Sequence, residues 1–246
     1  MTARASAIAA TSSKASISPS ALGAYGLLGM PLAMAALPLY VHLPKFYGDH
    51  LGVSLTALGL LLLALRIADG IVDPLLGAWS DRAASRKWLI GLAMPALAIG
   101  MLALFAPPAT DETGLLVWLG AALALTYAAF SLATINHNAW GAELSRDPVE
   151  RTRITATRET LALIGVVIAS VAPILLGGAG GEAAGLPRFA VAFAAICVGC
   201  TLVTLRWAPA ARRNVASASR LRARIAAPLA DPLFRRLLLV FMANGI

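Results

Sequence analysis

Long apolar runs separated by short polar segments dominate the chain from its first third to its end. A helix needs about 20 apolar residues to cross the hydrocarbon core of a membrane. Six runs approach or exceed that length: Ala21–Val41, Leu55–Ala78, Leu89–Phe105, Leu115–Ala139, Leu161–Leu176 and Phe189–Leu205. None has the ten-residue alternation of a membrane β-barrel strand. The pattern therefore predicts an all-α integral membrane protein with six membrane-spanning helices.

The polar segments divide the chain into four parts. We expect a cytoplasmic tail over residues 1–20, a six-helix bundle over 21–208, a basic cytoplasmic linker over 209–235 and the start of a seventh helix over 236–246. The seventh apolar run begins near Leu237 and reaches only Ile246, which is too short to span a membrane. We therefore expect the chain to be the N-terminal half of a longer protein, whose C-terminal half is its partner.

Composition and charge fit this picture. Only 13% of residues are charged and 59% are hydrophobic, whereas a soluble domain carries about 25% charged residues. The net charge of +8 would suit a nucleic-acid partner, but 17 of the 20 Lys and Arg residues fall on one side of the predicted spans. Positive residues mark the cytoplasmic side. The sequence thus predicts a multi-pass inner-membrane protein with a cytoplasmic N-terminus and no nucleic-acid partner. The linker charges either set topology alone or also contact anionic membrane lipid.

Small residues suggest how the helices pack. Gly23, Gly26 and Gly29 give the first span a face suited to close helix contact, and Pro31 and Pro38 should bend it. Cys197 and Cys200 lie within an apolar run, where they are expected to pack as small residues. The glycine-rich stretch 177–185 lacks the strand and lysine of a phosphate-binding loop, so a flexible connector is expected there.

Three charged residues interrupt the second span. Arg66, Asp69 and Asp73 lie at i, i+3 and i+7, which places them on one helical face within about two turns. Each charge near the centre of a span costs about 2.5–3.5 kcal/mol on insertion scales. One interpretation is a structural ion pair between Arg66 and Asp69. The other is binding and release of H⁺ or Na⁺, because two acids one turn apart disfavour double ionisation and so hold a proton or share a cation.

The residues that follow carry a family resemblance. Gly77, Asp81 and Arg82, with Arg86 and Lys87 beyond, resemble the loop between helices two and three of the major facilitator superfamily. The longer string from Arg66 through Asp69, Asp73 and Pro74 resembles the glycoside–pentoside–hexuronide:cation symporters of the melibiose permease type. The resemblance implies the six-helix N-terminal bundle of a major-facilitator fold. It also implies a secondary active transporter of a sugar, glycoside or similar polar solute.

The same resemblance implies roles for individual residues. Asp69 and Asp73 would bind the coupling cation, with Arg66 as their charge partner. Gly77, Asp81 and Arg82 would form the conformational loop motif. Asn136 and Trp140 in the fourth span and Arg158 in the fifth would contact the substrate; Trp140 could instead be an interfacial anchor.

Departures from the family pattern shape these expectations. Met30 and Pro31 replace a charged pair that is important for galactosides, and Asn136 replaces an acid. Val72 replaces a neutral oxygen ligand, which favours H⁺ over Na⁺. His137 is expected to be a buried neutral imidazole with a helical partner, or alternatively a further proton site. No cofactor, catalytic residue or metal site is expected.

Two other classes compete with a symporter. Asp69 and Asp73 bear some likeness to the Asp-rich motifs that hold Mg²⁺ in membrane transferases, but Pro74 and the lack of a later acidic pair argue against an enzyme. A transporter of lipids, lysolipids or other amphiphiles is the main alternative, because Pro31 and Asn136 leave the polar site neutral. A structural subunit without transport is a third interpretation.

Overall fold

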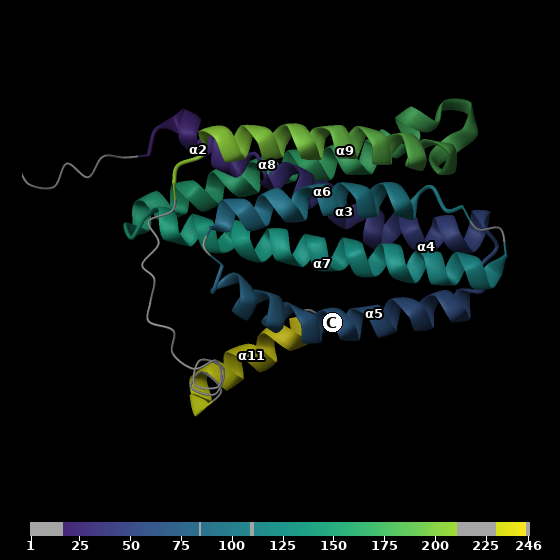
Figure 1. Cartoon of the computed structure of the whole chain (residues 1–246), viewed down its shortest axis with the longest axis horizontal. Coiled ribbons are helices and arrows are strands. Elements are labelled where there is room, and N and C mark those ends of the chain that lie inside the picture. Colours follow the sequence, from purple (N-terminus) through teal and green to yellow (C-terminus); the bar gives the residue numbers. More distant parts are fainter. Residues whose placement is uncertain (1–16, 84, 109–110, 211–229, 245–246) are drawn as a thin grey trace, which may run out of the picture. The chain divides into compact units, whose positions relative to one another are not determined.

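A computed structural model describes residues 17–83, 85–108, 111–210 and 230–244 (Figure 1). Most of the predicted tail and most of the predicted basic linker, including Arg212, Arg213, Arg220, Arg222 and Arg224, lie outside the described residues. The chain divides into two compact units, residues 1–212 and 213–246, and each is described by itself.

The described part of the first unit is helical. Its elements are α2 (Pro19–Gly26), α3 (Gly29–Leu37), η1 (Pro38–His42), α4 (Leu43–Lys45), η2 (Phe46–His50), α5 (Leu55–Ser80), α6 (Arg86–Leu104), α7 (Glu112–Leu144), α8 (Pro148–Gly177), η3 (Gly178–Gly180) and α9 (Gly181–Trp207). Five helical stretches among the described residues are long and apolar enough to cross a membrane. The longest, Pro148–Trp207, contains α8 and α9, which pack against each other, so the six predicted spans are present.

The helices extend beyond the apolar runs that predicted them. The side chains of Ser85, Asp111 and Asp147 accept hydrogen bonds from the first turns of α6, α7 and α8, respectively. These caps satisfy amide groups that have no partner within the helix. With 33 residues, α7 is longer than the roughly 20 needed to cross the hydrocarbon core. Hydropathy therefore located the spans, and capping chemistry set their ends.

The first span is interrupted, as the prolines predicted. A turn at residues 27–28 separates α2 from α3, and five-residue π-helical segments begin at Pro38 and Phe46. Proline has no amide proton to continue the helical ladder, which explains the breaks near Pro31 and Pro38. The chain remains helical as far as His50, so Lys45 lies on a helical turn beyond the apolar run that ends at Val41.

Two of the three predicted contact glycines bring α2 and α3 close to α8. A Cβ atom on Gly26 would lie 2.9 Å from Thr157, and one on Gly29 would lie 2.8 Å from the Arg158 carbonyl oxygen. Among the residues that the structure describes, a Cβ atom on Gly23 would meet nothing within 4 Å. The prediction of a tight glycine face therefore holds for Gly26 and Gly29 and fails for Gly23, which borders open space.

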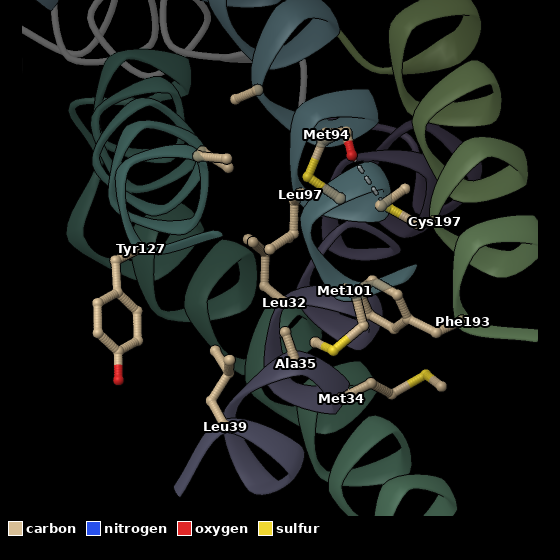
Figure 2. Close-up of a cluster of buried hydrophobic side chains, with 14 of the residues drawn as sticks. Leu32, Met34, Ala35, Leu39, Met94, Leu97, Met101, Tyr127, Phe193 and Cys197 are labelled. Carbon is tan, nitrogen blue, oxygen red and sulfur yellow. Dashed lines mark hydrogen bonds between the residues drawn. The ribbon is translucent and has the colours of Figure 1, made fainter. Parts of the chain in front are cut away.

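The core lies between α3, α6, α7 and α9 (Figure 2). Met94, Leu97 and Met101 of α6 are fully buried, as are Phe193 and Cys197 of α9. The Cys197 thiol donates a hydrogen bond to the Met94 carbonyl at 3.3 Å, as Figure 2 shows. Both cysteines are free and buried, which confirms that they serve packing.

The glycine-rich connector is shorter than predicted. Only Gly178–Gly180 separates α8 from α9, and Gly178 and Gly181 have positive φ angles that let the chain reverse. Gly185 lies within α9, where a Cβ atom would approach the Pro173 carbonyl oxygen to 1.7 Å. Close helix packing, rather than flexibility, explains that glycine.

Helix α5 is the least covered of the five long apolar stretches among the described residues. It packs mainly on α7 and buries only 6% of its most apolar 18-residue window. Ile67, Ile71 and Leu75 are each about 60% exposed. A membrane helix with this apolar surface is suited to contact lipid or another helix bundle.

The second unit contains α11 (Pro232–Asn244) among its described residues. The Asp231 side chain accepts a hydrogen bond from the Leu233 amide at 2.8 Å, and Pro232 opens the helix. Both features are typical of helix N-termini. The seventh helix was predicted to start at residue 236, so it begins four residues earlier than expected.

Candidate functional site

The charged group on α5 is only partly neutralised within the bundle. Arg66 and Asp69 form an ion pair at 3.8 Å, but a shorter bond of 2.9 Å joins the Arg66 guanidinium to the Tyr40 hydroxyl on η1. The Arg66 side chain is 55% exposed, whereas that of Asp69 is 14% exposed. The guanidinium therefore lies closer to the Tyr40 hydroxyl than to Asp69, the acid whose charge it was expected to balance.

Asp73 lies one turn further along α5. Its Oδ1 atom is buried and has no hydrogen-bond partner among the described residues. A buried carboxylate oxygen without a donor is costly, because the desolvation of the charged group is not repaid. A proton or a cation at this oxygen would remove that cost.

Helix α7 carries two hydroxyl groups near this part of the bundle, and one of them contacts α5. The Ser131 hydroxyl donates to Asp69 Oδ1 at 3.4 Å. The Thr134 hydroxyl is buried and has no partner among the described residues. The two helices run parallel, since Ser54 contacts Glu112 at one end and Ser80 contacts Asn136 at the other. Asp73 and Thr134 each lie about one helical turn beyond the Asp69–Ser131 contact. They therefore lie at similar depths along the two helices.

The structure separates the three residues expected at the substrate. Asn136 and Trp140 are fully buried. The Asn136 oxygen accepts from Ser80 at 2.5 Å, and its amide donates to the Leu132 carbonyl at 2.7 Å. The Trp140 indole donates to the Pro209 carbonyl at 3.1 Å. Both side chains are engaged in packing in this conformation, and neither borders the pocket at Arg158.

Arg158 borders a small polar pocket of about 160 Å³, together with Tyr25, Asn138 and Arg151. Its guanidinium donates to the Asn138 side chain on α7 and to Glu159. Asn138 was not singled out from the sequence. Since it lies seven residues after Ser131, it shares a face of α7 with that serine. The sequence holds no signal that singles it out, because a helix taken alone does not show which of its faces meets α8.

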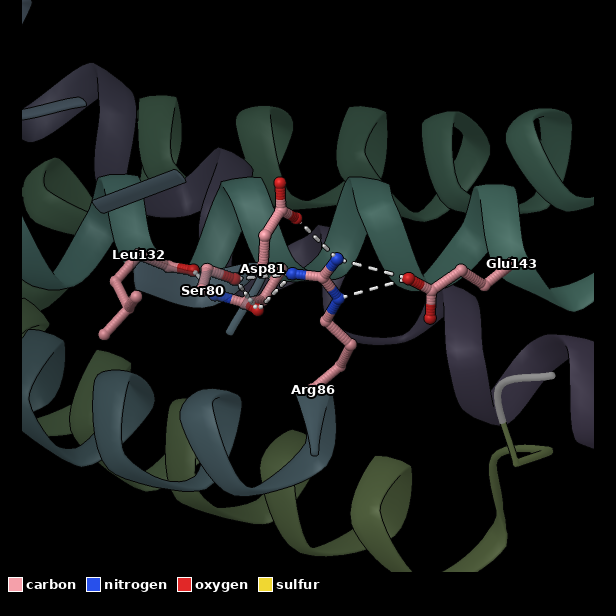
Figure 3. A network of polar contacts seen from close by, with 6 residues as sticks. Ser80, Asp81, Arg86, Leu132 and Glu143 are labelled. Carbon is pink, nitrogen blue, oxygen red and sulfur yellow. Dashed lines mark hydrogen bonds and ion pairs between the residues drawn. The ribbon is translucent and has the colours of Figure 1, made fainter. Parts of the chain in front are cut away.

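The predicted loop motif centres on Arg86 rather than on Arg82 (Figure 3). Arg86 is 7% exposed and contacts Asp81 at 3.0 Å and Glu143 at 3.2 Å. It also donates to the Ser80 hydroxyl at 2.5 Å and to the Asn136 oxygen at 3.3 Å. Arg82 is exposed, and a Cβ atom on Gly77 would meet nothing within 4 Å in the described part of the chain. The network joins the ends of α5 and α7 to the start of α6.

His137 is a core residue. It is 1% exposed, its Nε2 atom lies 3.0 Å from the Tyr25 carbonyl oxygen, and its ring lies 4.5 Å from the Tyr25 ring. This arrangement matches the expectation of a buried imidazole with a partner on a neighbouring helix. Within the described residues, no group of three or more His, Cys, Asp or Glu side chains could hold a metal ion.

Comparisons with known proteins agree on one family. A family model described as "MFS/sugar transport protein" matches residues 23–245. The inner membrane symporter YicJ of Escherichia coli is 27% identical over 131 residues, covering 51% of this chain and 28% of YicJ. The uncharacterized symporter YnaJ of Bacillus subtilis is 33% identical over 140 residues, covering 53% of this chain and 29% of YnaJ.

A third relative matches almost the whole chain. The uncharacterized symporter sll1374 of Synechocystis is 28% identical over 239 residues, covering 91% of this chain and 41% of that relative. The matched segments thus span between 28% and 41% of the length of these curated relatives.

Proposed function

The chain belongs to the MFS/sugar transport protein family, and on that ground we propose that it forms the N-terminal six-helix half of a cation-coupled symporter. The cargo would be a sugar, a glycoside or a similar polar solute. The observation that carries the proposal is the acid pair within α5, where the Asp73 Oδ1 atom has no donor among the described residues. The cation would occupy this pair.

The energetics favour reversible neutralisation of the pair. A charge near the centre of a span costs about 2.5–3.5 kcal/mol, and Arg66 can offset only one of two acids. Its 3.8 Å distance from Asp69 and its shorter bond to Tyr40 weaken even that pairing. A cation that binds between Asp69 and Asp73 would offset the remaining cost, and its release would restore it. Such a difference between states is what couples a cation to a conformational change.

We propose H⁺ as the coupling cation ahead of Na⁺. Val72 supplies no oxygen ligand between the two acids. Ser131 and Thr134 on α7 offer hydroxyl oxygens near this depth, and these are the groups through which Na⁺ would bind. The transport experiment therefore varies the pH gradient and the Na⁺ gradient separately.

For the substrate, we propose that Arg158 and Asn138 contact its hydroxyl groups. Both line the small pocket between α2, α7 and α8, and both carry several hydrogen-bonding groups. Asn136 and Trp140, which the family resemblance suggested, would first have to leave their bonds to Ser80 and Pro209. They would join the substrate only in another conformation of the transport cycle.

We further propose that the exposed face of α5 is directed toward a C-terminal half, with a cavity between the two halves near the midplane of the membrane. The small share of each relative that this chain covers supports a second half. We also propose that the N-terminus is cytoplasmic. Arg82, Arg86 and Arg206 lie at the end of the bundle where α2 begins, and positive residues mark the cytoplasmic side of a membrane protein.

The proposal is tested by transport in proteoliposomes that contain the protein at its full natural length. A panel of labelled sugars and glycosides is first screened by exchange, and accumulation of any that exchange is then driven by a pH or Na⁺ gradient. Asp69→Asn and Asp73→Asn should each abolish accumulation and leave exchange. Asp49→Asn, an exposed acid in η2, is the matched control and should accumulate like the wild type.

Two outcomes would overturn the proposal. Uphill accumulation that is unchanged in both Asp69→Asn and Asp73→Asn would exclude the proposed coupling site. Lysolipid uptake that ignores the pH gradient and survives Asp73→Asn would replace the sugar symporter with an amphiphile transporter.

A further inference from the structure

An apolar groove lies on a face of the bundle that the transport proposal does not use. It has a volume of about 610 Å³ and is bordered by α2, α8 and α9. Leu27, Leu161 and Val203 form its apolar walls, and Ser18, Ser20 and Trp207 border it as well. This volume is within the range of small-molecule sites, about 300–1,000 Å³.

The polar groups of the groove gather at one end. Ser18 and Ser20 begin α2, and their hydroxyls lie 3.3 Å apart. The Thr204 hydroxyl donates to the Ala24 carbonyl at 2.8 Å, so α9 runs beside α2 and ends near the serines. Trp207, the last residue of α9, therefore lies at the same end. The opposite end, toward Leu27, is apolar.

The length of the groove matches one leaflet of a bilayer. From Ser18 to Leu27 the helix advances nine residues, or about 13 Å at 1.5 Å per residue. The hydrocarbon core is about 30 Å thick, so one leaflet contributes about half of that. Tryptophan is enriched at the membrane interface, and Trp207 is 61% exposed at the polar end. The groove thus reaches from the headgroup level to about the bilayer midplane.

The charge at the polar end is positive. The Arg206 guanidinium lies 6.0 Å from the centre of the ring of Trp207, and Trp207 borders the groove at its polar end. None of the described residues that line the groove is an acid. An amphiphile with an anionic headgroup and an apolar chain matches this arrangement at both ends.

We propose that the groove binds one acyl chain of an anionic phospholipid from the leaflet at the Ser18 end. The phosphate would lie at Arg206 and accept hydrogen bonds from the serine hydroxyls, while the chain lies along Leu27, Leu161 and Val203. The lipid is a resident ligand that fills the seam between α2 and α9, and it is not the transported solute. The proposal holds whether or not the chain is part of a symporter.

A substitution at Gly23 can test whether the groove binds lipid. Gly23 lines the groove, and a Cβ atom at this position would meet none of the described residues within 4 Å. Gly23→Phe should therefore fill the groove without displacing a neighbouring helix. Gly199 on α9 is the matched control, since it is exposed, does not line the groove and has equally open space at its Cβ position.

The experiment measures quenching of Trp207 fluorescence by lipids with brominated acyl chains. The full-length protein is placed in nanodiscs of neutral phosphatidylcholine that hold a small, fixed fraction of brominated phosphatidylglycerol or brominated phosphatidylcholine. Subtracting the signal of Trp207→Phe isolates Trp207 from the other tryptophans. The apparent affinity for the anionic lipid should exceed that for the neutral one by about fivefold, the factor that about 1 kcal/mol per Arg near a membrane surface represents.

The variants separate the parts of the proposal. Gly23→Phe should remove the excess quenching by the anionic lipid, and Gly199→Phe should retain it. Arg206→Gln leaves the groove open but should abolish the preference between headgroups, which keeps the test valid if Gly23→Phe does not fold. Equal quenching by both lipids in the wild type would mean that ordinary surrounding lipid covers Trp207, and it would overturn the proposal. Excess quenching retained in Gly23→Phe would overturn it as well.

Discussion

Replacing Arg86 with methionine should destabilise the bundle more than any change at a neighbouring basic residue. Methionine keeps most of the volume and removes the charge and all the donors. Arg86 is 7% exposed and contacts Asp81, Glu143, Ser80 and Asn136 (Figure 3). Its removal leaves the acids without their shared cation at the place where three helices meet.

The magnitude follows from the burial of each partner. The Asp81 side chain is 38% exposed, so solvent screens its pair and the loss there is about 0.5 kcal/mol. Glu143 is 21% exposed and accepts two bonds from Arg86, and its Oε2 atom already lacks a partner among the described residues. Losing a charged hydrogen-bond partner costs about 1.5–3 kcal/mol. With the buried Ser80 bond included, we expect a total of about 3 kcal/mol.

The assay is thermal unfolding of the purified protein in detergent, followed by intrinsic fluorescence. For a domain of this size, about 3 kcal/mol corresponds to a fall in Tm of about 6–12 °C. Arg82→Met, at an exposed arginine four residues earlier in the chain, is the matched control and should change stability by about 0.5 kcal/mol or less.

A second variant tests the reason for the loss. Replacing a buried ion pair by apolar residues is often neutral, whereas removing one partner is costly. The double variant Arg86→Met with Glu143→Leu should therefore recover most of the stability lost in Arg86→Met. A Tm for Arg86→Met that equals that of Arg82→Met would refute the reasoning. So would a double variant that is less stable than Arg86→Met alone.

Two further predictions concern helix packing. Gly165→Ala should destabilise the bundle by about 1–3 kcal/mol, because its Cβ atom would lie 2.2 Å from the Met30 carbonyl oxygen; thermal unfolding against Gly199→Ala, which meets nothing within 4 Å, checks this. Lys87→Met should speed amide exchange in the last turn of α9, since the ammonium group donates to two carbonyls there at 2.8 and 3.2 Å. Unchanged exchange in that turn would show that the lysine does not hold the end of α9.

Hydropathy predicted the spans well because the membrane imposes a simple rule. Each helix must satisfy its own backbone and present about 20 apolar residues to lipid, so length and composition suffice to locate it. The ends of the helices were less predictable. Asp111 and Asp147 cap α7 and α8 well beyond the apolar runs, and these caps depend on local polar chemistry that hydropathy does not measure.

The candidate site was predicted in part. The family resemblance and the cost of charge in lipid both directed attention to Asp69 and Asp73, whose cation role stays a prediction. Helical spacing places Asn136 and Asn138 about 200° apart on α7, but it does not show which of the two meets a neighbouring helix. Only the packing of α8 against α7 brings Arg158 to Asn138 and leaves Asn136 with Ser80.

The sequence by itself determined that the chain is an all-helical membrane protein of the major facilitator type, with a costly acid pair in its second span. These properties depend on composition and order along one helix, which the bilayer selects directly. The tertiary structure decided which polar groups meet across helices. It made Arg86 the centre of the loop network, drew Trp140 into the core and left Gly23 facing an open groove. Such pairings follow from how neighbouring helices are rotated and spaced, and no single apolar run contains that information.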